Sequence, residues 1–343
     1  MSKNFYCTYF DSNFIHSGLS LLQSLIQHDS NCFIFVLCLD CETFKSLQNF
    51  EKDKIKLLPL EEFENSNNDL LTAKINRSIT EYYWTLTPYL IFDLLFTQKV
   101  GNSITYLDAD QFFYSNPDII FEEIGDNDIT IMPHRYQTFN NSAKEHGEFN
   151  VSWVTFKNTK NSLECLNWWK KSCFVWCYAA GDKTRYGDQK YLDEFPKRYK
   201  SVHIIKNIGC GVAPWNLASF DYESPLILFH FQSFRLRSQN ILTAVIPKFT
   251  KCDLKKFKKY ILIPYFKSLQ KNIAKRNHNS MNCSDKSLVH NEDQVLFIQF
   301  FNQIFLLYGK KLNLYLLLFT TARSNIVKKL TINFSKKLRI TKN

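Results

Sequence analysis

The chain has 343 residues, of which 45% are hydrophobic and 22% charged, and its formal net charge is +11. This balance excludes an intrinsically disordered protein, and the length suffices for one large α/β domain with an appendage. Cys38 and Cys41 are separated by two residues but lack a second pair or His partners at zinc spacing, so no structural zinc is predicted.

The first elements indicate an α/β unit. Residues 5–10 read as a strand with no signal-peptide core before it, so reduced cysteines and a cytoplasmic location are expected. Apolar residues at helical spacing follow in 15–28, and 32–39 is the continuous apolar run of a buried parallel strand. Ligands in open α/β sheets bind beyond the carboxyl ends of strands, which makes residues 8–11 a candidate nucleotide contact. An ordinary turn is the alternative.

A loop and a long helix come next. Residues 61–73 are polar and Asn-rich and are predicted to form a loop. Residues 77–96 have the pattern of a helix, with Ser78 or Thr80 as its cap. Pro88 lies inside this pattern, and we expect the helix to break or kink before it.

Two carboxylates follow the β-rich run 104–107. Side chains alternate along a strand, so Asp108 and Asp110 are expected to project to the same side where the strand ends. Two close acids repel unless a cation lies between them, and hard divalent ions with oxygen ligands suit such a pair. The sequence therefore predicts a Mg²⁺ or Mn²⁺ site. A phosphatase with Asp108 as nucleophile is disfavoured, because that motif usually follows the first strand and runs into a Gly/Thr turn.

The remaining elements of the main domain alternate again. We expect helices in 118–124, 163–178 and from 185 onward, strands in 129–133, 149–156 and 226–231, and a loop that orders on binding in 137–148.

The charge is unevenly distributed. Residues 1–247 carry 23 Lys and Arg against 28 Asp and Glu, whereas residues 248–343 carry 20 against 4, giving −5 and +16. This asymmetry predicts a domain boundary near Pro247 and an anionic partner for the C-terminal part. The apolar run 295–308 places its polar residues on one helical face and is short for a spanning helix. A basic, aromatic helical extension that contacts an anionic membrane surface is predicted, and packing on the main domain is the alternative. No nucleic-acid-binding motif accompanies the charge, so nucleic acid is not an expected partner.

An ordered set of motifs resembles one enzyme family. YLDADQFFYSNP, PHR, FNVSWVTFKN and GDQKYL occur in the order typical of GT-A fold nucleotide-diphospho-sugar transferases, most like the family 8-like bacterial enzymes that build surface polysaccharides. The resemblance covers roughly residues 4–237. It implies a Rossmann-like, mixed central sheet flanked by helices in a domain of residues 1–247, followed by the helical extension 248–343.

The resemblance also implies site residues. Thr8, Tyr9 and Asp11 match the edge that holds the base and ribose, and Arg77 matches a residue beside the nucleotide. Asp108 and Asp110, with His230 as a third ligand, would hold Mn²⁺ or Mg²⁺.

Further residues match the sugar and phosphate sides of that site. Asn150, Asp188 and Gln189 match residues against the donor sugar. Arg235 and Arg237 suit diphosphate oxygens, which Arg grips with two hydrogen bonds. The family ending HxxGxxKPW is not intact, because Pro-Trp occurs earlier, at 214–215, and Arg replaces Lys.

These features predict a metal-dependent glycosyltransferase, of EC class 2.4 and by resemblance retaining. It would move a sugar from a nucleotide-diphosphate donor, UDP-sugar foremost, to a glycan or lipid-linked glycan in surface polysaccharide or lipopolysaccharide synthesis. It would lie in the cytoplasm or on the inner face of the membrane. The rival is a non-catalytic nucleotide-sugar or glycan-binding protein docked on membranes through its basic C-terminal region.

Overall fold

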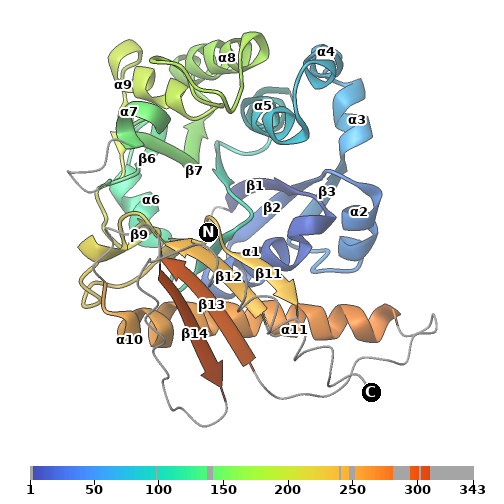
Figure 1. The fold of residues 1–343 in the computed structure, drawn as a ribbon. Coiled ribbons are helices and arrows are strands. Elements are labelled where there is room, and N and C mark those ends of the chain that lie inside the picture. The colour runs from blue at the N-terminus through green and yellow to red at the C-terminus, as the bar shows by residue number, and fades with distance from the viewer. Residues whose placement is uncertain are drawn as a thin grey trace. The chain divides into compact units, whose positions relative to one another are not determined.

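The structure, a computed structural model, describes residues 3–97, 99–136, 142–238, 241–246, 252–280, 294–300 and 303–309. The chain forms two compact units (Figure 1): Met1–Gln232 with Thr250–Ser284, and Ser233–Phe249 with Asp285–Asn343. The predicted domain boundary at 247/248 remains a prediction. The two compact units divide the chain differently, because the segment after residue 250 returns to the first unit.

A mixed seven-stranded sheet forms the centre of the first unit, with the order β3-β2-β1-β4-β7-β6-β8. Its strands are β1 (Asn4–Phe10), β2 (Cys32–Cys38), β3 (Ile55–Pro59), β4 (Ser103–Leu107), β6 (Ile129–Pro133), β7 (Phe149–Lys157) and β8 (Val202–Ile204). Strands β1 to β4 run parallel, while β7 is antiparallel to both β4 and β6. The predicted α/β class with a mixed central sheet is confirmed.

Helices cover both faces of this sheet. The longer ones are α1 (Ile15–His28), α5 (Ile79–Phe92) and α8 (Lys160–Val175). The shorter ones are α2 (Cys41–Leu47), α3 (Leu60–Asn65), α4 (Asp69–Ile75), α6 (Asp118–Ile124), α7 (Ser142–His146), α9 (Phe195–Arg198), η1 (Ser12–Phe14), η2 (Asp93–Thr97), η3 (Lys190–Glu194) and η4 (Leu217–Ser219). One apolar core contains residues of α5 and α8, such as Leu86 and Trp169, and a second contains residues of α1 and α6, such as Leu22 and Ile120. The sheet is therefore buried on both sides, as its apolar strands require.

A second, three-stranded sheet positions the site. It pairs β5 (Gln111–Phe113) with β10 (Leu228–His230), which in turn pairs with β9 (Cys210–Val212). In the β5–β10 pair His230 lies opposite Gln111, and the Phe231 amide donates to the Asp110 carbonyl at 2.7 Å. This pairing brings a late strand beside the acidic motif.

Two local predictions for residues 61–96 were wrong. Residues 61–73 are mostly helical, in α3 and α4, because the buried Glu64 accepts hydrogen bonds from Lys74 and Tyr82 and so anchors this polar segment. The helix α5 also continues through Pro88, and the Ser78–Glu81 capping box fixes its start. The tertiary contacts outweigh the local signals here.

A C-terminal helical segment packs on α1 within the first unit. It comprises α10 (Leu254–Lys256), η5 (Phe257–Leu262) and α11 (Ile263–Ser280). Asn272 accepts from Gln23 at 2.9 Å and donates to Ser20 at 3.0 Å, and the Tyr265 hydroxyl bonds Ser17 at 3.1 Å. Among the described residues, no helix has the length and apolar character needed to cross a bilayer.

The second unit contains a four-stranded sheet of β11 (Arg235–Ser238), β12 (Ile241–Ile246), β13 (Gln294–Phe300) and β14 (Gln303–Gly309). Strands β12 and β13 run parallel, and β13 and β14 are antiparallel. The helical expectation for 295–308 was therefore wrong. Short apolar runs do not separate strand from helix by periodicity alone, and this one is rich in Phe and Ile, which favour strands.

Candidate functional site

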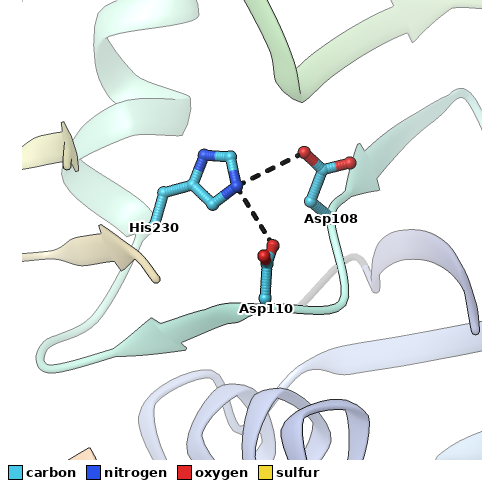
Figure 2. Close-up of side chains that lie close together, drawn as sticks. All are labelled: Asp108, Asp110 and His230. Carbon is cyan, nitrogen blue, oxygen red and sulfur yellow. Dashed lines mark ion pairs between the residues drawn. The ribbon is translucent and has the colours of Figure 1, made fainter. Parts of the chain in front are cut away.

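Asp108, Asp110 and His230 form a cluster of potential metal ligands. One ligand atom from each lies within 4.8 Å of the others. His230 Nε2 is 3.6 Å from Asp108 Oδ2 and 3.0 Å from Asp110 Oδ1, and the imidazole points at both carboxylates (Figure 2). The acids come from the turn between β4 and β5 and the imidazole from the end of β10. The predicted pair and its predicted partner are thus brought together.

His230 is buried, while Asp108 and Asp110 are partly exposed, and the three groups shift one another's pKa. Burial, together with the charge of Asp110, raises the pKa of Asp108 to about 6, against the opposing effect of His230. Burial alone would lower the pKa of His230, but the charge and hydrogen bond of Asp110 outweigh it, so this pKa is raised. A proton on His230 therefore offsets part of the negative charge of the two acids. Two carboxylate oxygens and one imidazole nitrogen are also a donor set that Mn²⁺ accepts, so the residues fit the predicted ion.

A row of hydroxyl groups joins the cluster to Asp188. The Tyr106 hydroxyl donates to Asp108 Oδ1 at 3.0 Å, and the Tyr9 hydroxyl bonds Thr87 Oγ1 at 3.0 Å. The two tyrosine rings lie 5.5 Å apart. Burial raises the pKa of Asp188 to about 7, with a further rise from the charge of Asp108 and an opposing hydrogen bond from Thr87. Asp188 therefore lies near enough to Asp108 for the charge of one to act on the other.

Asn150 and Gln189 contact each other. Asn150 Nδ2 donates to Gln189 Oε1 at 3.2 Å, and Gln189 Nε2 donates to the His146 carbonyl at 2.7 Å. Gln189 lies just before η3, in a turn where Gly187 has a φ of +51°. A Cβ at Gly187 would lie 3.0 Å from the Trp84 ring, so both the backbone and the packing require glycine there.

The other predicted nucleotide contacts have varied surroundings. Thr8 is buried, and its hydroxyl has no hydrogen-bond partner among the residues that the structure describes. The Asp11 carboxylate caps η1 by accepting from Asn13. Arg77 donates to Thr85 Oγ1 and to the Phe174 carbonyl, so its guanidinium already joins α5 to the end of α8. Their roles with nucleotide remain predictions.

Arg235 and Arg237 belong to β11, in the second unit. Arg235 donates to the Phe234 carbonyl at 2.8 Å. Their role as phosphate contacts remains a prediction.

Sequence reasoning missed several residues of this site. Trp215 packs edge-on against the His230 ring, with centroids 5.5 Å apart, and its Nε1 donates to the His134 carbonyl. The displaced Pro-Trp pair could have indicated it. Tyr106 was marked only as the first residue of the YLDADQFFYSNP motif, and Thr87 gave no signal, because a hydroxyl on a buried strand or helix resembles any other core residue.

Two proteins of Bacillus subtilis (strain 168), both described as uncharacterized, are similar to the chain. YfnD is 31% identical over 249 residues, which are 69% of this chain and 79% of YfnD. YfnF is 30% identical over 267 residues, which are 73% of this chain and 87% of YfnF. The chain belongs to the family of YfnD and YfnF. No model of a described protein family matches it.

Solved structures similar to this YfnD/YfnF family member include three glycosyltransferases. The galactosyltransferase LgtC, in complex with donor and acceptor sugar analogs, has 15% identity and a TM-score of 0.49, covering 78% of this chain and 95% of LgtC. Mouse xyloside xylosyltransferase 1 has 12% identity and a TM-score of 0.43, covering 67% and 98%. GlyE of Streptococcus pneumoniae, in its apo form, has 16% identity and a TM-score of 0.46, covering 80% and 64%.

Proposed function

We propose that this protein is a metal-dependent glycosyltransferase that moves a sugar from a nucleotide-diphosphate donor to a glycan acceptor. The observation that carries the proposal is the convergence of Asp108, Asp110 and His230, whose ligand atoms lie within 4.8 Å of one another at the end of a parallel strand. Nucleotides bind at such sheet edges, and the ordered motifs in the sequence support the same class of reaction. UDP-sugar is the donor we propose to test first.

Asp108, Asp110 and His230 would hold Mn²⁺ or Mg²⁺, and a bound ion would neutralise charge on the departing diphosphate. The chain's own contribution is to keep these ligands close together and to bury the imidazole. His230 is 4% exposed, and Trp215 covers its ring. Tyr106 holds one oxygen of Asp108 by hydrogen bond, which leaves the other oxygen facing His230.

Asp188 and Gln189 would line the donor-sugar side. Both lie in the turn before η3, and Asp188 is electrostatically coupled to Asp108. An ionised Asp188 would stabilise positive charge on the sugar as its bond loosens. We propose retention of configuration, as the sequence resemblance implies, with a surface polysaccharide or lipopolysaccharide as the product.

The decisive assay is Mn²⁺-dependent release of the nucleoside diphosphate from a panel of nucleotide sugars. The wild-type protein should hydrolyse or transfer at least one donor, and Asp110→Asn should reduce turnover by about 10³-fold or more, since a ligand to the ion is lost. A matched control is Asp126→Asn, an exposed aspartate in the turn after α6. Equal turnover in wild type and Asp110→Asn would contradict the proposal. Donor binding without turnover in the wild type would favour the non-catalytic alternative.

We further propose that the segment α10–α11 contacts an anionic membrane surface from the cytoplasmic side. Leu254, Tyr260 and Ile263 are 36%, 52% and 37% exposed. Exposed lysines accompany them along the same segment: Lys255, Lys256, Lys259, Lys267 and Lys271. A basic face with apolar and aromatic residues is typical of interfacial helices.

Vesicle sedimentation tests this contact. Each lysine near an anionic surface contributes about 1 kcal/mol, so Lys255→Glu with Lys259→Glu should release the protein from phosphatidylserine vesicles. Lys160→Glu, an exposed lysine at the start of α8, is the control. Sedimentation of the double variant at the wild-type level would contradict the contact.

A further inference from the structure

The orientation of the Asn150 amide is fixed by the backbone. Asn150 is 5% exposed, and its Oδ1 accepts from the Ser152 amide at 2.8 Å. A reversed amide would set an NH₂ group against the Ser152 N–H, two donors facing each other. The Asn150 nitrogen therefore lies on the side of His134 Nε2, at 3.0 Å, and of Gln189 Oε1, at 3.2 Å.

This orientation determines the tautomer of His134. An amide NH₂ only donates, so Nε2 must accept, and a neutral imidazole then carries its proton on Nδ1. Burial lowers the pKa of His134 to about 3, with a further lowering by His230, so the ring is neutral at physiological pH. Two aromatic rings fix the plane of the His134 ring. The Tyr136 ring stacks on it, with centroids 4.5 Å apart and an interplanar angle of 14°, and the Trp215 ring packs edge-on, with centroids 5.5 Å apart. Nδ1 has no partner of good hydrogen-bond geometry among the described residues, although the backbone of Gly147 and Glu148 is close enough to raise the pKa.

The same contacts fix the Gln189 amide. Its oxygen faces the Asn150 NH₂ group and its nitrogen donates to the His146 carbonyl at 2.7 Å. Both hydrogens of the Asn150 amide are engaged, one by His134 and one by Gln189. Asn150 thus has no donor left for a ligand, whereas Gln189 keeps one N–H and one oxygen lone pair.

We infer that His134 and Asn150 are positioning residues. His134, as a neutral acceptor through Nε2, holds the Asn150 amide in the orientation that the Ser152 N–H also favours. Asn150, together with the His146 carbonyl, then determines which end of the Gln189 side chain carries the oxygen. This assigns Asn150 a role other than the direct sugar contact that the sequence suggested. The inference rests on the proposed transfer reaction only where it predicts kinetics. Its structural part, that the His134 ring carries its proton on Nδ1, does not depend on the reaction.

Nitrogen-15 NMR of the full-length protein labelled at histidine tests that part without any substrate. At pH 7 the resonance that disappears in His134→Phe should show a protonated Nδ1 and an unprotonated Nε2. In Asn150→Asp a carboxylate faces Nε2, so Nε2 should gain a proton. A wild-type His134 protonated at Nε2, or at both nitrogens, would overturn the inference, whatever the protein's activity.

Kinetics test the positioning. His134→Phe keeps a flat ring against Tyr136 and Trp215 but removes the acceptor, so kcat should fall about 10-fold to 100-fold while KM for the donor changes little. His134→Gln, whose carbonyl oxygen can accept from Asn150, should recover part of that loss. Tyr136→Phe keeps the stacked ring and is the control. If the wild-type protein is active and His134→Phe keeps its kcat, Gln189 needs no support from His134 and the positioning role is wrong. If the wild-type protein shows no turnover, the proposed function is contradicted, and the NMR result alone decides the inference about His134.

Discussion

At the scale of single residues, protons and a metal ion would compete for the same atoms of Asp108 and His230. Burial raises the pKa of Asp108 to about 6, and Asp110 raises the pKa of His230. A metal ion needs both groups deprotonated, so its binding displaces protons. The apparent affinity for Mn²⁺ should therefore rise as the pH increases from 5 to 8, because the ion has fewer protons to displace at the higher pH. Calorimetric titration at several pH values measures this, and an affinity that does not change with pH would contradict it.

The raised pKa of Asp188 predicts that the stability of the folded chain depends on pH. Its pKa is raised to about 7, so between pH 4 and 7 the folded chain holds a proton that the unfolded chain has released. This contribution to stability is complete below the unfolded pKa and is lost as the pH rises through 7. Asp188→Asn removes this titration. The unfolding free energy of the variant minus that of the wild type should therefore be larger at pH 8 than at pH 4, by up to about 4 kcal/mol.

Urea unfolding in the presence of a chelator measures this difference. Asp126→Asn, at an exposed position, is the control. A constant difference between Asp188→Asn and wild type at all pH values would show that Asp188 is not held in an apolar environment.

At the scale of elements, the turn before η3 depends on Gly187. Its φ of +51° is unfavourable for any residue with a Cβ. The Trp84 ring also lies 3.0 Å from the position that a Cβ would occupy, which is a tight contact. Gly187→Ala should cost about 1–2 kcal/mol of stability for the backbone alone, and should also reduce turnover by displacing Asp188 and Gln189.

Gly125→Ala separates the two effects. Gly125 also has a positive φ, of +52°, but the nearest described atom to a Cβ there would be the Glu122 carbonyl oxygen, at 3.9 Å. That variant should lose stability and keep its activity. Equal activity in both variants, measured as nucleoside diphosphate release, would contradict a special role for the Gly187 turn.

The element scale also shows what the sequence could and could not predict. The strand before Asp108, the strand that begins at Phe149 and the strand that ends at His230 all have apolar patterns that local rules detect. The helices in 61–73 were missed because Glu64 becomes favourable only once Lys74 and Tyr82 surround it. Contacts between distant segments are invisible to a local pattern.

In the candidate site, too, the sequence predicted some residues, while others depend on contacts between distant segments. The motif and its spacing predicted Asp108 and Asp110, while His230 came from the resemblance. The pairing of β5 with β10, which places His230 opposite Gln111, is a long-range contact that spacing alone does not give. The sequence marks His134 only as part of the PHR motif, because its significance depends on the orientation of the Asn150 amide.

At the scale of the whole molecule, the first unit needs the segment after residue 250. Asn272 is 1% exposed and bonds Gln23 and Ser20 on α1. Asn272→Leu would remove the acceptor of the Gln23 amide and one of the hydrogen bonds to Ser20, and should cost about 1–3 kcal/mol in urea unfolding. Lys271→Ala, one residue earlier and exposed, should cost almost nothing. Equal unfolding midpoints for Asn272→Leu and Lys271→Ala would show that α11 does not stabilise the first unit.

The central claim is that Asp108, Asp110 and His230 hold a divalent ion that the reaction needs. Titration of the full chain with Mn²⁺ in the presence of UDP tests it most directly, followed by the free Mn²⁺ signal in electron paramagnetic resonance. We predict one tightly bound Mn²⁺ per chain, with affinity reduced by about 100-fold or more in Asp110→Asn. Equal Mn²⁺ binding by the wild type and Asp110→Asn would contradict the account.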